Sequence, residues 1–165
     1  MKGTAISFLR PMTEPEFAAW LAQAIPAYAA DKVASGQRSL QDSLALSAKE
    51  HDELLPQGLA TPDNHLFMIV DANNVAVGML WFAVQPKFEA RVAYVYDIEV
   101  LPERRREGHA HRAFVALEDE ARKLSLSGIA LHVFGHNQAA RALYASLGFE
   151  PTNISLFKTV AATAV

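Results

Sequence analysis

Residues 104–110 read RRREGHA, which places three arginines beside a glycine and a small alanine. An apolar run with strand character, AYVYDIEVLP, precedes them, and a stretch with helical spacing, HRAFVALEDEARKL, follows them. The first N–H groups of a helix have no partner within it, and the helix dipole adds partial positive charge there. A pyrophosphate can satisfy both, if Gly108 and Ala110 let the backbone approach it. The spacing R-x-x-G-x-A from Arg105 therefore predicts an anion-binding turn, with a solvated turn as the alternative.

Two other phosphate-binding loops do not fit this turn. No G-K-[ST] follows the glycine, so the nucleoside-triphosphate loop is excluded. The dinucleotide fingerprint needs several glycines, and only Gly108 is present.

The composition is that of one folded domain, with 165 residues of which 51% are hydrophobic and 20% charged. The chain has no cysteine, which excludes disulfides, thiolate metal ligands and a cysteine nucleophile. A formal net charge of −3 gives no overall attraction to nucleic acid or to an anionic membrane. No apolar run approaches the roughly 20 residues that span a bilayer, so we expect a cytoplasmic protein.

The elements that must position the turn follow from hydrophobic periodicity. Helices are expected after the N-caps Thr13, with Glu16 three residues later, and Ser39. Two more helices are expected over Ala110–Leu124 and Ala140–Leu147, the second capped by Gly148. Apolar or alternating runs predict strands over 6–9, 65–70, 75–84, 91–100, 127–134 and 153–160, with a DANN turn joining the second and third.

Strict alternation along 91–100 places its side chains on two faces. Asp97 and Glu99 share one face with Ala93 and Val95. The larger side chains are expected on the other face, namely those of Val92, Tyr94, Tyr96, Ile98 and Val100.

The block from Tyr96 to Gly148 resembles the Gcn5-related N-acetyltransferase (GNAT) family, whose members move an acyl group from acyl-coenzyme A to an amine. DIEVLPERRREGHA is similar to the coenzyme-binding strand, loop and helix start of that family, and LHVFGHNQAARALYASLGF is similar to its second block. The resemblance implies an α/β (α+β) fold: a mixed, largely antiparallel sheet of six to seven strands flanked by about four helices. It implies a single domain over 1–165, in which 1–64 shape the acceptor site and 92–150 bind acyl-CoA.

The resemblance also implies roles for particular residues. Arg105 would begin the loop, and the pyrophosphate would be held by the backbone amides of Arg106, Glu107, Gly108, His109, Ala110 and His111. Ile98 and Val100 would bond the pantetheine arm through backbone groups, as an added strand would. Asn137 and Ala140 would contact the cofactor arm, and Tyr144 would stand near the sulfur. Glu107 departs from the family pattern, and its carboxylate is expected to point to solvent so that only its backbone contributes.

The implied reaction needs a proton acceptor, because a free alkylamine has a pKa of about 10.4 and is mostly protonated at neutral pH. Glu99 is the first choice as general base and Asp97 the second, acting directly or through one water. Tyr144 could protonate the departing thiolate, and the Val100 N–H could stabilise the oxyanion. Without a cysteine, direct transfer in a ternary complex is expected.

Each of these residues also has a purely structural interpretation. Tyr144 lies on an apolar stripe and could be a core residue. Asn137 precedes a helix and is a natural N-cap. Glu99 could pair with an arginine, and His109 and His111 could project outward. No third ligand is spaced to join those two histidines, so no metal is expected.

The sequence thus predicts an N-acetyltransferase that uses acetyl-CoA to acetylate a primary amine on a small molecule or peptide. An acyl-CoA-binding regulatory module without turnover is the alternative, and a nucleic-acid-binding protein is disfavoured by the acidic balance. A homodimer is possible, because an exposed end of the sheet could pair.

Overall fold

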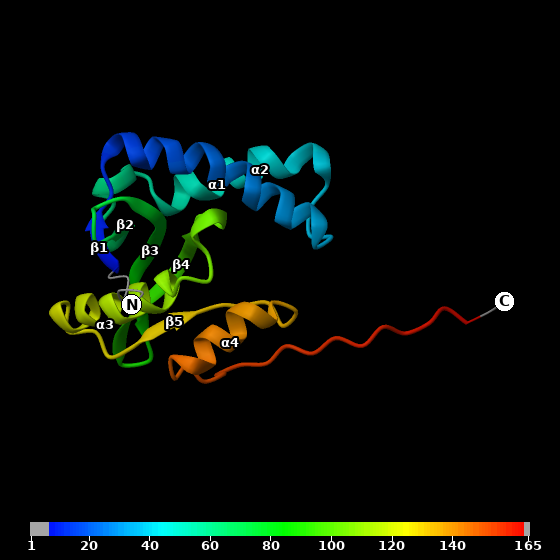
Figure 1. Cartoon of the computed structure of the whole chain (residues 1–165). Helices are drawn as coiled ribbons and strands as arrows, with labels where there is room; N and C mark the ends of the chain where they lie inside the picture. The colour runs from blue at the N-terminus through cyan, green and yellow to red at the C-terminus, as the bar shows by residue number, and fades with distance from the viewer. Residues whose placement is uncertain (1–6, 164–165) are drawn as a thin grey trace. The chain divides into compact units, whose positions relative to one another are not determined.

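The computed structural model describes residues 7–163, which fall into two compact units that divide after His132. The first unit holds a five-stranded sheet and three α-helices, and the second holds one further α-helix (Figure 1). The α/β class and the four helices that the sequence predicts are thus confirmed.

The sheet runs in the order β1 (Ser7–Pro11), β2 (Asn64–Asp71), β3 (Ala76–Lys87), β4 (Ala90–Val100) and β5 (Ile129–Leu131). The first four strands pair antiparallel, and β5 pairs parallel to β4. The expectation of a mixed, largely antiparallel sheet is confirmed. Residue 6, which the sequence assigned to the first strand, lies outside the described residues.

The expected count of six to seven strands is wrong, because the strand expected over 153–160 forms no ladder with any described residue. Its extended chain runs away from the last helix (Figure 1). Its large apolar side chains are exposed, namely Ile154, Leu156, Phe157 and Val160. An alternating pattern shows that a segment is suited to a sheet, but a strand also needs a neighbour that supplies its hydrogen bonds.

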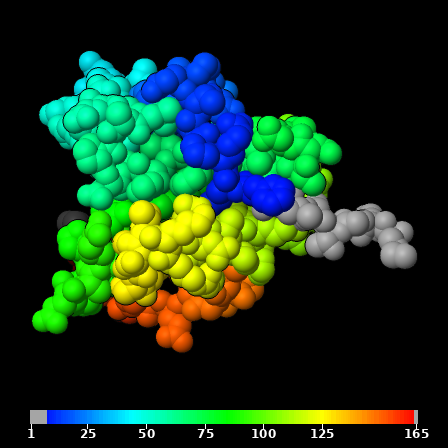
Figure 2. All heavy atoms as spheres, turned by 90° about the vertical axis from the view of Figure 1, so that its left-hand side faces the viewer, coloured from blue at the N-terminus to red at the C-terminus, as the bar shows by residue number. Residues whose placement is uncertain are grey.

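Two layers of helix cover the sheet of the first unit, with α1 (Glu14–Ala34) and α2 (Leu40–Leu54) on one face and α3 (His109–Lys123) on the other (Figures 1 and 2). The short 3₁₀ turns η1 (Gly58–Ala60) and η2 (Pro102–Arg104) precede β2 and α3. The predicted N-caps hold: α1 begins after Thr13 and α2 after Ser39, whose side chain accepts a hydrogen bond from Asp42 N.

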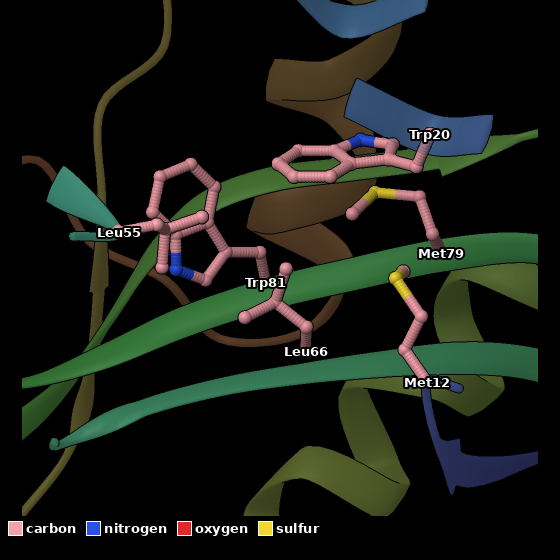
Figure 3. Packing of buried hydrophobic residues seen from close by; sticks show 6 residues of the cluster. All are labelled: Met12, Trp20, Leu55, Leu66, Met79 and Trp81. Atoms are coloured by element: carbon pink, nitrogen blue, oxygen red, sulfur yellow. The ribbon is translucent and has the colours of Figure 1, made fainter. Parts of the chain in front are cut away.

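Buried side chains fill both sides of the sheet. Where α1 packs on the sheet, six buried residues form a cluster: Met12, Trp20, Leu55, Leu66, Met79 and Trp81 (Figure 3). The sheet face that carries Leu66, Met79 and Trp81 is called the α1 face below. Toward α3, Leu80 and Phe82 of β3 are fully buried, as are Phe114 and Leu117 of the helix.

A β-bulge in β4 changes which side chains share a face. Asp97 lies opposite Trp81, but Val95 lies opposite Phe82, so Tyr96 is the extra residue. The ring of Tyr96 stacks on Trp81, with 4.6 Å between centroids, so Tyr96 lies on the α1 face with Asp97. The strict alternation expected along this strand is therefore wrong at Tyr96. Asp97 and Glu99 do share a face, because they lie opposite Trp81 and Met79.

The parallel pair β4–β5 is short. It joins Ala93 to Ile129, Tyr94 to Ala130 and Val95 to Leu131. In the described part of the chain, no strand pairs with residues 96–100 on the side away from β3. This edge of β4 is therefore open to an added extended group.

Gly78 is needed where β3 and β4 approach each other beside Glu99. A Cβ at this position would lie 2.1 Å from the Glu99 carbonyl oxygen, which is backbone and cannot turn aside. We expect Gly78→Ala to destabilise the protein by about 3 kcal/mol, which lowers the melting temperature by roughly 6–12 °C. Gly128→Ala is the matched control, because no atom lies within 4 Å of its added Cβ. Equal melting temperatures for the two variants would contradict the close approach.

Candidate active site

The turn between β4 and α3 has the backbone of an anion site. Arg106 and Gly108 both adopt left-handed φ, 66° and 82°, and α3 begins directly afterwards at His109. Gly108 is the N-cap and offers no side-chain cap. The amide of Arg112, which bonds the Gly108 carbonyl at 3.1 Å, is the first with an acceptor in the helix pattern. The first-turn amides up to His111 thus precede the helical ladder, as the sequence predicts.

The Glu107 side chain is 44% exposed, as expected, and its carboxylate is also held by neighbours within the turn. Its Oε2 lies 2.9 Å from His109 Nε2 and 3.2 Å from Arg104 Nε. Arg104 also pairs with Asp71, the last residue of β2, at 3.3 Å. The hydrogen bond to His109, and next that to Arg104, lowers the pKa of Glu107. Its negative charge is therefore compensated before any anion approaches.

The two histidines of the turn differ in burial. His111 is exposed, but His109 is 1% exposed, so the outward expectation for His109 is wrong. Its Nδ1 lies 3.3 Å from a guanidinium nitrogen of Arg112, which also donates to the Glu107 carbonyl at 2.6 Å. His109 is buried because it starts the helical stripe that packs on the sheet.

Four arginines surround the turn. Arg105 Nε donates to the Val100 carbonyl at 3.0 Å and so ties the loop to the end of β4. No hydrogen bond or ion pair joins the Arg106 side chain to any described residue. The sequence reasoning missed Arg112, although its position four residues after Gly108 places it one helical turn away, over the glycine.

Successive residues of β4 direct their backbone N–H and C=O groups alternately toward β3 and toward the opposite edge of the strand. Leu101 N bonds Val77 O at 2.9 Å, so Glu99 and Asp97, two and four residues earlier, also direct their amides toward β3. Ile98 and Val100 therefore direct theirs toward the open edge. The Val100 carbonyl is used by Arg105, which leaves the Val100 N–H and both groups of Ile98.

The two candidate bases differ in environment. Glu99 is exposed, whereas Asp97 is partly buried. Burial raises the pKa of Asp97, and the charge of Glu99 acts in the same direction. The Trp20 N–H and His51 act in the opposite direction and lower the pKa of Asp97. Among the described residues, the buried Trp20 Nε1 has no acceptor that meets both the distance and the angle of a hydrogen bond, so its effect on Asp97 is that of a nearby donor.

His51 lies close enough to Asp97 to interact with its charge, and the sequence reasoning treated it only as part of a helical stripe. It is buried, and its Nδ1 is 2.8 Å from the Ser47 carbonyl. That carbonyl can only accept, so Nδ1 carries a proton and donates to it. The ring packs against Trp20 and Tyr28, with centroids 6.1 and 5.7 Å apart.

A pocket of about 200 Å³ lies between α1 and the α1 face, and Glu99 lines it. Its apolar lining consists of Ala19, Trp20, Met68, Ala76, Met79 and Leu101. Its polar lining consists of Glu16, Gln23 and Glu99, and Gly78 completes the wall. A carboxylate beside an apolar pocket is suited to an amine, because it can accept the ammonium proton.

Glu16, at the edge of this pocket, gives a pH prediction. Arg10 donates to both of its carboxylate oxygens, at 2.8 and 3.1 Å, and the Thr13 amide donates at 2.9 Å. These bonds, led by that of Arg10, lower the pKa of Glu16 from 4.5 to about 2. Ionised Glu16 therefore adds stability above about pH 4.5, which is lost as pH falls toward 2.

We expect Glu16→Gln to reduce stability at pH 7 by about 1 kcal/mol. The variant should also lose less stability than the unaltered protein between pH 4.5 and 2. Urea unfolding at several pH values measures both effects, with Glu14→Gln as the control because Glu14 lies in the same first turn. Parallel pH profiles for Glu16→Gln and the unaltered chain would contradict the assignment.

The second unit, residues 133–163, contains α4 (Gln138–Ser146). Asn137 is its N-cap and accepts from the Ala140 amide at 3.2 Å. Gly148, at φ 86°, ends it as predicted, with its amide on Ala145 O and that of Phe149 on Tyr144 O. The rings of Tyr144 and Phe149 meet edge-on at 5.6 Å. The roles of Asn137, Ala140 and Tyr144 toward a coenzyme stay predictions.

Comparisons with known proteins agree on one family. The model of the acetyltransferase (GNAT) family matches residues 28–149. YycN of Bacillus subtilis (strain 168), which carries the name N-acetyltransferase, is 36% identical over 150 residues, covering 91% of this chain and 96% of its own. YdgE of the same organism, also named an N-acetyltransferase, is 29% identical over 150 residues with the same coverage.

Solved structures give the same fold. The crystal structure of YycN superposes with a TM-score of 0.85 at 35% identity, covering 94% of this chain and 99% of that one. AAC(6')-Iy, solved in complex with the bisubstrate analogue CoA-S-monomethyl-acetylneamine, superposes with a TM-score of 0.62 at 19% identity, covering 94% and 99%. Across residues 7–163, no helix is both long and apolar enough to cross a membrane.

Proposed function

Because this chain belongs to the Gcn5-related N-acetyltransferase family and is an enzyme of that type, we propose that it transfers the acetyl group of acetyl-CoA to a primary amine. The acceptor amine belongs to a small molecule or a peptide. The observation that carries the proposal is the start of α3, where first-turn amides, a glycine and four arginines come together.

The residues of this turn fit a pyrophosphate. A Cβ at Gly108 would lie 2.7 Å from Arg112 Nη1, so a larger residue would displace a cation and fill the approach to the amides. Arg105 opens the loop, and the amides of Arg106–His111 hold the pyrophosphate. The open edge of β4 offers both backbone groups of Ile98 to the amide groups of the pantetheine arm, and the Val100 N–H lies at the end of that arm, beside the thioester. Asn137 and Ala140 contact the same arm in this proposal.

Acetyl-CoA supplies the acetyl group as a thioester. Glu99 takes the proton of the acceptor ammonium, directly or through one water, and the neutral nitrogen then forms a bond to the acetyl carbon as the carbon–sulfur bond breaks. The Val100 N–H stabilises negative charge on the acetyl oxygen. Tyr144 gives its phenolic proton to the departing sulfur and regains one from the second proton that the nitrogen loses as the amide forms, and Glu99 releases the first proton to water. Asp97 is the alternative base, because burial raises its pKa above that of an ordinary aspartate and so favours proton uptake.

Two measurements test the proposal. Calorimetry with acetyl-CoA should show saturable binding by the full chain, and free-thiol detection should show turnover when primary amines are added. Desulfo-CoA and an N,N-dimethylated amine are the controls, because the first lacks the thiol and the second has no primary nitrogen. Binding without turnover across a broad amine panel would favour the regulatory alternative, and absence of binding would overturn the proposal.

The cytoplasmic location and the homodimer stay predictions, as does the absence of nucleic-acid and membrane partners. Light scattering after size exclusion measures the mass in solution. A mass of twice 18.0 kDa would support the homodimer, and a mass of 18.0 kDa would contradict it.

A further inference from the structure

The pocket beside Glu99 has a distinct charge pattern. Its polar side chains are Glu16, Gln23 and Glu99, and none of its lining residues is basic. Glu16 is already neutralised by Arg10 at 2.8 Å. No basic side chain of the described chain forms an ion pair with Glu99. A ligand in this pocket therefore meets one uncompensated negative charge, which attracts an ammonium and repels a carboxylate or phosphate.

The rest of the lining selects for an apolar ligand. Trp20 offers no hydrogen-bond acceptor, Met68 and Met79 offer only weakly accepting thioether sulfurs, and Ala19 and Ala76 add only methyl groups. Against this apolar part of the wall, a polar body with many hydroxyl groups would lose hydrogen bonds to water that the three polar side chains replace only in part. An alkyl or aromatic body instead gains about 25 cal/mol for each Å² of apolar surface that it buries.

The volume limits the size of that body. At about 200 Å³ the pocket is smaller than the range of about 300–1,000 Å³ that holds a drug-sized ligand. A single ring or a short alkyl chain fits these dimensions, and the rest of a larger molecule would lie outside the pocket, in solvent.

We propose that the acceptor is a small primary amine with an apolar body and no acid group near its nitrogen. This inference rests on the proposed acetyl transfer and names its substrate class. The ammonium lies at Glu99, and the apolar body lies between α1 and the side chains of Met68 and Met79 on the sheet. Gln23 contributes to this specificity, because its uncharged amide lines the pocket and offers no cation to an acid group of the acceptor.

Two amines that differ in one group test the charge preference. Phenethylamine has the required ammonium and ring, and phenylalanine adds a carboxylate to the same framework. With acetyl-CoA, the unaltered protein should show a kcat/KM for phenethylamine at least ten times that for phenylalanine. A ratio near one, or a preference for phenylalanine, for a lysine peptide or for an aminoglycoside, would overturn the inference while leaving acetyl transfer intact.

Paired variants on α1 locate the effect in this pocket. Gln23→Arg should reduce the ratio at least tenfold, and Ala22→Arg, exposed on the same helix outside the pocket, should leave it unchanged. Ala19→Trp should fill the pocket and weaken phenethylamine binding at least tenfold, whereas Ala18→Trp should not. Equal effects within either pair would contradict the proposed site.

Calorimetry with phenethylamine alone separates this inference from the proposed function. Binding that Ala19→Trp removes and Ala18→Trp preserves would support the amine pocket even if acetyl transfer failed. Absence of binding, together with acetylation of other amines, would overturn the pocket assignment only.

Discussion

Glu99→Gln should lower kcat/KM for acetyl transfer by about 10²–10⁴-fold, the usual loss when a general base is removed. Glutamine keeps the size of the side chain but cannot take up the ammonium proton. Because acetyl-CoA is assigned to the α3 turn and the edge of β4, its affinity should change less than twofold. Thiol-release kinetics and calorimetry on the same preparation measure the two quantities.

Asp97→Asn distinguishes the two candidate bases. If Glu99 is the base, the pH dependence of the rate should persist in Asp97→Asn but vanish in Glu99→Gln. If Asp97 is the base, the pattern of the two variants reverses, and the raised pKa of Asp97 places the fall in rate above the range of an ordinary aspartate. A Glu99→Gln variant with unaltered rate and pH profile would remove Glu99 from the chemistry.

Substitution of His51 separates two roles of its ring, namely packing against its aromatic neighbours and an electrostatic effect on the Asp97 carboxylate. Replacing His51 by Asn removes the ring from the Trp20–Tyr28 packing, so it lowers stability whatever the chemistry. Only an electrostatic effect on Asp97 would also shift the pH profile of an Asp97-dependent rate. This comparison matters because the ring lies on a different element from both carboxylates.

The sequence was most informative where structure depends on neighbouring residues. Thr13, Ser39 and Gly148 each occupy the predicted helix cap, because caps satisfy backbone groups within a few residues. The DANN turn likewise closes the β2–β3 hairpin with Asn74 at φ 60°. The change of hydrophobic period alone predicted a helix from Ala110, one residue after α3 begins at His109.

Features that depend on distant elements were not predictable. The bulge at Tyr96 arises from how β4 pairs with β3, and the alternating pattern of β4 contains no sign of it. The burial of His109 and the proximity of His51 to Asp97 depend on helices packing against the sheet. For residues 153–160 the local pattern predicted a strand that does not form, because no other strand of the described chain pairs with this segment.

Gly108→Val should abolish the thermal stabilisation that acetyl-CoA gives. At 100 times its Kd, a ligand stabilises by about 2.7 kcal/mol, which corresponds to a rise of roughly 5–11 °C in the melting temperature. In the variant, the Cβ meets Arg112 at 2.7 Å, and its methyl groups cover the amides that would hold the pyrophosphate. Thermal melts with and without acetyl-CoA measure the difference.

Strain alone must be separated from this effect, because valine is disfavoured at φ 82°. Gly36→Val is the matched control: Gly36 has φ 72°, and no atom lies within 4 Å of its added Cβ. It should lower the melting temperature of the free protein by a comparable amount and keep the full acetyl-CoA shift. Loss of the shift in both variants would assign the effect to destabilisation rather than to the turn.

The double variant Gly108→Val with Arg112→Ala decides what the glycine does. Removing the guanidinium relieves the 2.7 Å contact but leaves the valine over the first-turn amides. If close backbone approach is what acetyl-CoA requires, the double variant stays without a thermal shift, whereas Arg112→Ala alone keeps most of it. If the shift returns in the double variant, the glycine serves only to seat Arg112, and the anion site formed by the amides of α3 is contradicted.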